Sequence, residues 1–124
     1  MIHHVQLACP VGSEAVLRGF YGRVLGFDEL AKPPVLAARG GCWFRGHGIE
    51  LHLGVEEDFR PARKAHPGLL VEGLDAWAAR LREAGYPVTF DGDFPGMRRF
   101  YSQDPLGNRL EFLEPIDPGI ANRT

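Results

Sequence analysis

Hydrophobic and polar residues alternate along several short stretches of the chain, as expected of strands with one buried face. Two longer stretches place apolar residues three and four positions apart, which predicts amphipathic helices. The first helix is expected within residues 10–27, with Ser13 as its N-cap and Gly26 at its end. The second is expected over residues 74–85 and ends at Gly85. Strands are expected at residues 2–9, 27–30, 35–39, 41–45, 48–54, 66–73, 86–90, 98–102 and 109–115.

This order of elements occurs twice, which indicates an internal repeat. In each half, a strand that begins with a histidine leads into a helix, and a later strand carries a glutamate. Glu50 follows His4 by 46 positions, and Glu111 follows His66 by 45. The sequence therefore predicts an α+β fold of two tandem βαβββ modules, which form a curved, barrel-like mixed sheet with the helices on its outer face.

One domain, residues 1–124, is expected to contain both modules. The first repeat covers about residues 1–54 and the second about 66–115. The charged, proline-containing segment 55–65 is predicted to link them, and residues 116–124 form a tail.

Alternation within the strands places the glutamates on polar faces, because residues two apart in a strand point to the same side. Glu50 shares a face with His52, opposite a wholly apolar face. Glu111 lies opposite Leu110 and Phe112. A buried, unpaired carboxylate is costly, so both glutamates are expected to have a cationic partner.

The same alternation assigns the histidines. His4 lies on the strand face opposite Val5 and Leu7. His66 lies opposite the apolar face of the strand that opens the second repeat. His3 shares its face with Val5 and Leu7, so His4 is the better candidate for a site on the polar face.

Two imidazoles and two carboxylates on equivalent faces would converge if the sheets curl toward each other. Such mixed nitrogen and oxygen ligation suits a divalent ion of Ni, Co, Mn, Fe or Zn, which would supply the charge that Glu50 and Glu111 need. Salt bridges from Arg45 and Arg109 could instead neutralise the glutamates without a metal. Each residue taken alone could also be an ordinary strand residue.

The composition narrows the class of protein. The chain of 124 residues is 44% hydrophobic and 24% charged, with a formal net charge of −2, which gives no reason to expect nucleic acid or an anionic membrane as a partner. No apolar run approaches about 20 residues and no signal-peptide pattern is visible, so a cytoplasmic location is expected. Cys9 and Cys42 are expected to be buried thiols in a reducing compartment.

At these motifs the sequence resembles the vicinal oxygen chelate superfamily, which includes glyoxalase I, bleomycin resistance proteins, fosfomycin resistance enzymes and extradiol dioxygenases. The resemblance reaches across nearly the whole chain. The matching stretches are HHVQL, FYGRVLGF, GIELHL, HPGLLVEGLDAWAARLREAG and DPLGNRLEFLEP.

The resemblance implies that His4, Glu50, His66 and Glu111 hold a divalent metal, which chelates two neighbouring oxygens of a small substrate. It also implies Lewis-acid chemistry, with Glu111 as the preferred catalytic base. The retained set of two histidines and two glutamates looks most like bacterial glyoxalase I, a metal-dependent lyase or isomerase. Residues that could contact substrate are His52, Trp43, Phe44, Phe94, Met97 and Arg109.

Two other functions belong to the same superfamily. A bleomycin-resistance-like protein would bind a small molecule or antibiotic without a metal, and a ring-cleaving dioxygenase would open a catechol ring. In many single-domain relatives the modules pair across subunits, so a homodimer is expected, although the linker could also allow pairing within one chain.

Overall fold

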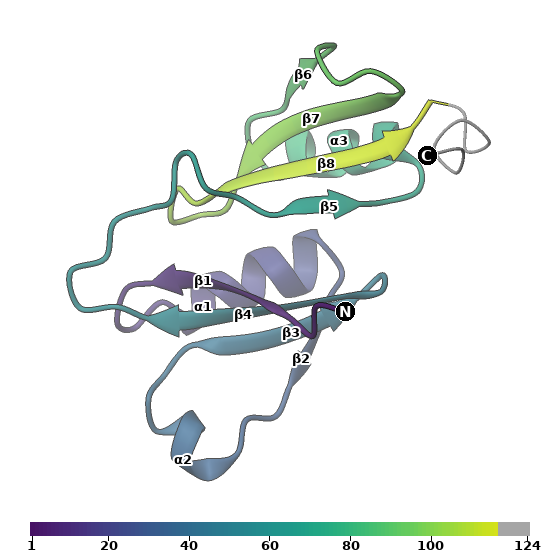
Figure 1. Ribbon diagram of the computed structural model, residues 1–124. Coiled ribbons are helices and arrows are strands. Elements are labelled where there is room, and N and C mark those ends of the chain that lie inside the picture. Colours follow the sequence, from purple (N-terminus) through teal and green to yellow (C-terminus); the bar gives the residue numbers. More distant parts are fainter. Residues whose placement is uncertain (117–124) are drawn as a thin grey trace.

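The computed structural model of the chain describes residues 1–116 and shows two four-stranded sheets (Figure 1). Each sheet, together with its main helix, is one βαβββ module. The elements of the first module are β1 (Val5–Cys9), α1 (Glu14–Leu17), η1 (Arg18–Val24), β2 (Asp28–Leu30), α2 (Pro34–Ala37), β3 (Cys42–Gly46) and β4 (Ile49–Val55). Those of the second are β5 (Gly68–Leu70), α3 (Leu74–Glu83), β6 (Thr89–Asp91), β7 (Met97–Gln103) and β8 (Arg109–Pro115).

The two sheets have the same topology. Their strand orders are β1-β4-β3-β2 and β5-β8-β7-β6. The pairs β1–β4 and β5–β8 are parallel, and the other neighbouring strands are antiparallel. The predicted α+β fold of two tandem βαβββ modules is therefore confirmed. Both sheets are open, and the described strands of one are not hydrogen-bonded to those of the other, so they do not close into a barrel.

One local prediction was wrong and another was confirmed only in position. Residues 35–39 were expected to be a strand, but α2 occupies Pro34–Ala37 because Pro34 at the first helical position has its backbone preset for a helix. Ser13 is at the N-cap of α1, yet its hydroxyl donates to the Pro10 carbonyl and makes no cap hydrogen bond. The first helix continues from α1 into a π-helical segment, η1, and the chain turns at Gly26 with φ +76°.

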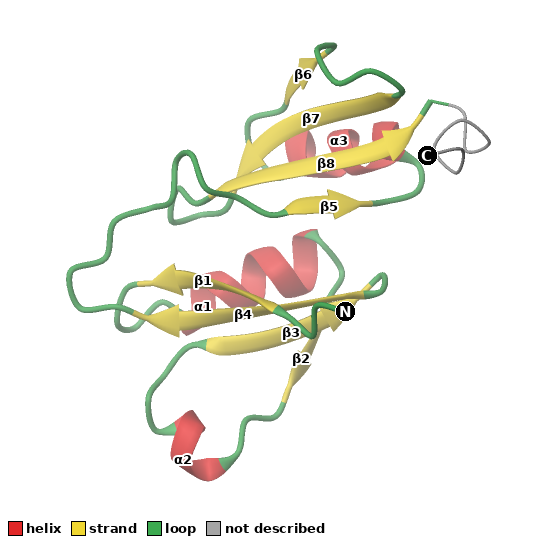
Figure 2. Cartoon of the chain, viewed as in Figure 1, coloured by secondary structure: helices red, strands yellow, loops and turns green. Residues whose placement is uncertain are grey.

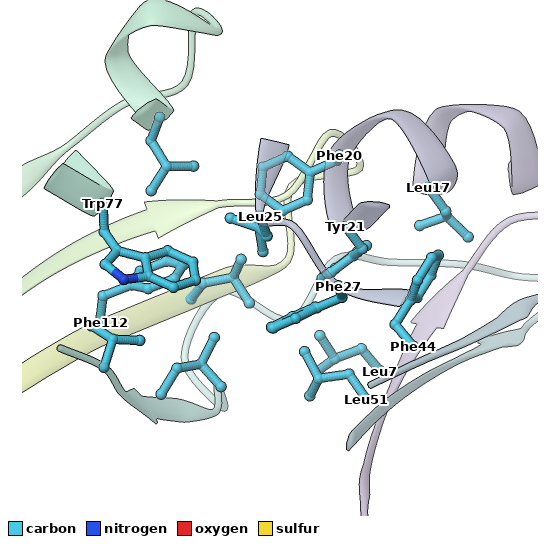
Figure 3. Close-up of a cluster of buried hydrophobic side chains, with 14 of the residues drawn as sticks. Leu7, Leu17, Phe20, Tyr21, Leu25, Phe27, Phe44, Leu51, Trp77 and Phe112 are labelled. Atoms are coloured by element: carbon cyan, nitrogen blue, oxygen red, sulfur yellow. The ribbon is translucent and has the colours of Figure 1, made fainter. Parts of the chain in front are cut away.

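The core is continuous between the modules (Figure 3). In the first module the Tyr21 ring stacks on Phe44 with centroids 5.4 Å apart, and in the second Trp77 lies 5.6 Å from Phe112. Phe20 of η1 meets Tyr86, which follows α3, edge to face at 4.7 Å. Burying such aromatic side chains contributes about 1.5–3 kcal/mol each, so the shared core fixes the modules against each other.

Both sheets expose their other faces on one side of the molecule. In Figure 2, α1 and α3 lie behind the strands of their own modules, and the opposite sheet faces are turned toward the viewer. None of the described helices is long and apolar enough to cross a membrane.

Candidate metal centre

The first cluster of polar side chains lies at the start of β1 and β4. Val5 is opposite Leu51 in the parallel ladder, so His4 and Glu50, one residue earlier on each strand, lie side by side. Donor atoms of His3, His4 and Glu50 lie within 4.8 Å of one another. This group is the one set of three or more histidine, cysteine or acidic residues in the described chain that is close enough to hold a metal.

Glu50 is held from two sides. His52 Nε2 lies 2.8 Å from Glu50 Oε2, and Arg45 donates through Nη2 to Oε1 at 2.8 Å. These contacts, that of His52 first and that of Arg45 second, lower the pKa of Glu50 to about 2, so the carboxylate is ionised at neutral pH. Burial lowers the pKa of His52, while its hydrogen bond to Glu50 acts in the opposite direction.

The His52 ring lies between two other rings. It stacks on Trp43 with centroids 4.2 Å apart and planes 9° from parallel. On its other face it stacks on His4 with centroids 3.9 Å apart and planes 14° from parallel. Trp43 pairs with His52 across the β3–β4 ladder, and this register brings the rings together. The stack therefore connects His4 to the body of the sheet.

The second cluster joins β5 and β8. His66 Nε2 lies 2.9 Å from Glu111 Oε1, and His66 Nδ1 lies 2.7 Å from the Lys64 carbonyl oxygen. A carbonyl can only accept, so Nδ1 carries a proton. In the neutral ring Nε2 then carries a lone pair that faces the Glu111 carboxylate. This arrangement requires a proton or a cation between the His66 nitrogen and the Glu111 oxygen.

Two arginines complete the second cluster. Arg99 Nη1 donates to Glu111 Oε2 at 3.4 Å, and the same guanidinium is bonded to Asp91. The Arg109 guanidinium lies 3.9 Å from the centroid of the Tyr101 ring, a cation–π contact. Tyr101 also meets His66 edge to face at 5.5 Å.

The four predicted ligands thus form two half-sites, His4 with Glu50 and His66 with Glu111. In the described residues of one chain no hydrogen bond, ion pair or metal-compatible cluster joins the two half-sites. Both lie on the sheet faces opposite the helices, as alternation predicted. Leu51, Leu110 and Phe112 are fully buried on the helix side.

The structure changes several sequence-based assignments. His3 was assigned to the apolar face, but β1 begins only at Val5, so His3 is exposed and lies 4.0 Å from Glu50. Arg109 was considered as a partner for Glu111, but Arg99 contacts that carboxylate. Phe44 was expected to line a substrate pocket; it is instead fully buried against the helix.

The remaining residues assigned to substrate binding lie in different modules. Trp43 and His52 are in the first half-site, whereas Phe94 and Met97 line a groove of about 390 Å³ beside β6 and β7. That groove is lined by neither Trp43 nor His52.

Arg99 and Tyr101 contact Glu111 and His66, and sequence reasoning missed both of them. They are two apart on β7 and therefore share a face, but only the antiparallel register, with Tyr101 opposite Glu111, brings that face to the site. Strand alternation predicts that Arg99 and Tyr101 share a face, but nothing in the sequence predicts which residues of β8 lie opposite them.

Tandem βαβββ modules, each with a histidine and a glutamate on its open face, are the arrangement of the vicinal oxygen chelate fold. The chain belongs to the Glyoxalase/Bleomycin resistance protein/Dioxygenase superfamily, whose family model matches residues 1–112. It is similar to a glyoxalase family protein from Bacillus anthracis, with 46% identity, coverage of 93% of this chain and 94% of that one, and a TM-score of 0.89.

Two further relatives differ in kind. TnmS3, an antibiotic binding protein from Streptomyces sp. CB03234, is 28% identical over 93% of this chain and 97% of its own, with a TM-score of 0.68. Glyoxylase I 4 of Arabidopsis thaliana is 30% identical in an alignment of 92 residues, with coverage of 68% of this chain and 51% of that protein. The chain thus spans about half the length of this relative.

Proposed function

We propose that the protein is a metal-dependent, glyoxalase-type lyase or isomerase that acts on a small substrate with two neighbouring oxygens. His4, Glu50, His66 and Glu111 would hold one divalent ion of Ni, Co, Mn, Fe or Zn. Two neutral imidazole nitrogens and two carboxylates form a donor set that suits these ions.

The observation that carries this proposal is the environment of His66. Histidines that bind metals usually donate their other ring N–H to a carbonyl or carboxylate, which fixes the tautomer and turns the lone pair to the ion. His66 makes such a bond to Lys64, and its second nitrogen faces Glu111. A cation between these two groups would remove the unfavourable approach of lone pair and carboxylate.

A bound ion would act as a Lewis acid on negative charge that develops at substrate oxygen. The part of Glu111 would be to take a proton from substrate carbon and return it at the neighbouring carbon. Arg99 contacts the other carboxylate oxygen and would hold Glu111 in place. Trp43 and Tyr101 would exclude water from the two sides of the site.

We further propose that the working unit is a homodimer in which each site combines half-sites of two chains. Two observations support it: the half-sites are separate within one chain, and the shared core fixes the modules in that arrangement. Both open faces lie on the same side, so a second copy related by a twofold axis could set first module against second. Leu70, 59% exposed on the open face of β5, would then be covered.

Metal content tests the proposal. Protein purified without a His-tag should contain roughly one divalent ion per chain, either as isolated or after reconstitution with Ni, Co, Mn, Fe or Zn. The variants Glu50→Ala and His66→Ala should lose the ion and keep their circular dichroism spectrum. Wild-type protein that takes up none of these ions would refute the enzymatic function. Hemithioacetals would be the first substrates screened, and catechols under oxygen the second.

A metal-free binding protein for an antibiotic or other small molecule is the second candidate. Its support is that both glutamates already have a cationic neighbour, Arg45 or Arg99, and that the chain is 28% identical to an antibiotic binding protein. A doubly protonated His66 would then form an ion pair with Glu111. In this case ligands should bind equally well before and after treatment with a chelator.

A further inference from the structure

His52 lies beside two of the proposed metal ligands, His4 and Glu50, and is not itself one of the four. Its side chain is 6% exposed, and it is flanked by rings on both faces. Its Nε2 is turned to Glu50, 2.8 Å away. A buried imidazole with one nitrogen directed at a carboxylate and both faces covered has little freedom to rotate.

The groups around the His52 ring are two of the proposed ligands and the side chain of Trp43. His4 stacks on one face of the ring and Glu50 accepts at its edge, while Trp43 covers the other face. His4 itself precedes β1 and is exposed, so no ladder hydrogen bond of the strand fixes it. The stack on the buried His52 therefore restrains the His4 ring, whose other described contact is with the exposed His3, with the two Nδ1 atoms 3.0 Å apart.

Glu50 is restrained in a similar way. Its other described side-chain contacts are with Arg45, whose side chain is 61% exposed, and a distant contact with His3. An exposed arginine loses little when a carboxylate turns away from it, because water solvates both groups and weakens a surface ion pair. His52 is buried and cannot follow such a movement, so it sets the direction of the carboxylate.

We infer that His52, anchored by Trp43, is a positioning residue that holds His4 and Glu50 in the orientation needed to bind the metal ion. This inference rests on the proposed function, because it concerns the same ion. Among the described residues of the second module no ring stacks face to face on His66, which is oriented by the Lys64 carbonyl instead. The two half-sites thus orient their histidines by different means, one with an aromatic stack and one with a backbone hydrogen bond.

Three substitutions separate the two contacts of His52. His52→Phe keeps a ring between Trp43 and His4 but removes the donor to Glu50. His52→Gln keeps an N–H donor and removes the stacked ring, and His52→Leu removes both. The control is His47→Asn, because His47 also packs on a tryptophan, Trp77 at 4.9 Å, but lies away from the proposed ligands. Asparagine tolerates the positive φ of 54° at this position.

The readout is Co²⁺ affinity, measured by titration of apoprotein and by the visible absorption of the bound ion. His52→Leu should weaken binding about 10–100-fold, as is typical when a residue that orients a ligand is removed. The variants His52→Phe and His52→Gln should each bind Co²⁺ more tightly than His52→Leu but less tightly than the wild type. His47→Asn should bind Co²⁺ as the wild type does. Thermal unfolding of each apoprotein shows whether the fold is kept.

The outcomes are distinguishable. Wild-type protein that does not bind Co²⁺ or the other ions would remove the proposed function, and this inference with it. Wild-type protein that binds Co²⁺ while His52→Leu binds within about twofold of it would overturn the inference alone. Equal, complete loss of binding in all three variants would show that His52 is itself a ligand, which also overturns its positioning role.

Discussion

Glu111 lies on β8 between two fully buried residues, Leu110 and Phe112, in a position where a carboxylate would ordinarily be excluded. Its side chain points to the opposite, open face of the sheet, where His66 and Arg99 each contact one of its oxygens. The alternation of the strand thus separates one charged group from its apolar neighbours within a few ångströms. The result is a carboxylate that is shielded from water and held at both oxygens.

Glu111→Gln should keep much of the bound metal and lose most of the turnover, by about 10²–10⁴-fold. The amide oxygen can still ligate weakly, but the amide cannot take a proton. Metal content and kcat, measured on the same preparation with a substrate from the screen, check this. Glu50→Gln is the matched control and should lose activity only in proportion to the metal it loses. If Glu111→Gln behaves in the same way, Glu111 is a ligand and not a base.

At the scale of elements, the turn Asp104–Asn108 before β8 connects the two modules. Asn108 Nδ2 donates to the Ala8 carbonyl of β1 at 2.9 Å, and Asn108 Oδ1 accepts from the Ala62 amide at 3.0 Å. The Tyr21 hydroxyl donates to Asp104 at 2.8 Å. This one turn therefore holds the first module, the linker and the second module together.

Asn108→Ala should lower the free energy of unfolding by about 2–4 kcal/mol, because it leaves the half-buried Ala8 carbonyl and Ala62 amide without the partners they have now. Urea unfolding followed by circular dichroism measures this. Gln103→Ala, at an exposed position on the neighbouring strand β7, should change stability by less than about 0.5 kcal/mol. A similar small change for Asn108→Ala would show that the turn does not hold the modules together.

At the scale of the whole molecule, the two modules pack against each other on the side of their helices, and their other sheet faces are left open. The core and the Asp104–Asn108 turn fix their relative position, and this position keeps the half-sites apart. This separation is the reason for the proposed dimer, in which a second chain would bring His4 and Glu50 to His66 and Glu111.

Mixed dimers of His4→Ala and Glu111→Ala chains test the exchange of half-sites. If sites combine two chains, a mixed dimer has one site with both lesions and one intact site. Random assembly makes half of the dimers mixed, so co-refolded protein should recover about a quarter of wild-type metal and activity. No recovery would show that each site is formed within one chain. A monomer by light scattering at micromolar concentration would contradict the dimer itself.

The sequence by itself determined the modules and the polar faces, because both follow from local periodicity. Strand alternation placed Glu50 and Glu111 on open faces, and the repeat paired each with a histidine. Where several local signals competed the prediction failed: residues 35–39 contain strand-like alternation, but the preceding prolines start α2.

Only the tertiary structure decided which side chains meet across strands and modules. Register placed Trp43 against His52 and Tyr101 against Glu111, and a shift of one residue would have turned those side chains to the other face. Sequence spacing also could not show that the two half-sites lie apart in one chain. Their separation depends on how the helix faces of the modules pack, and that packing is a property of the assembled core.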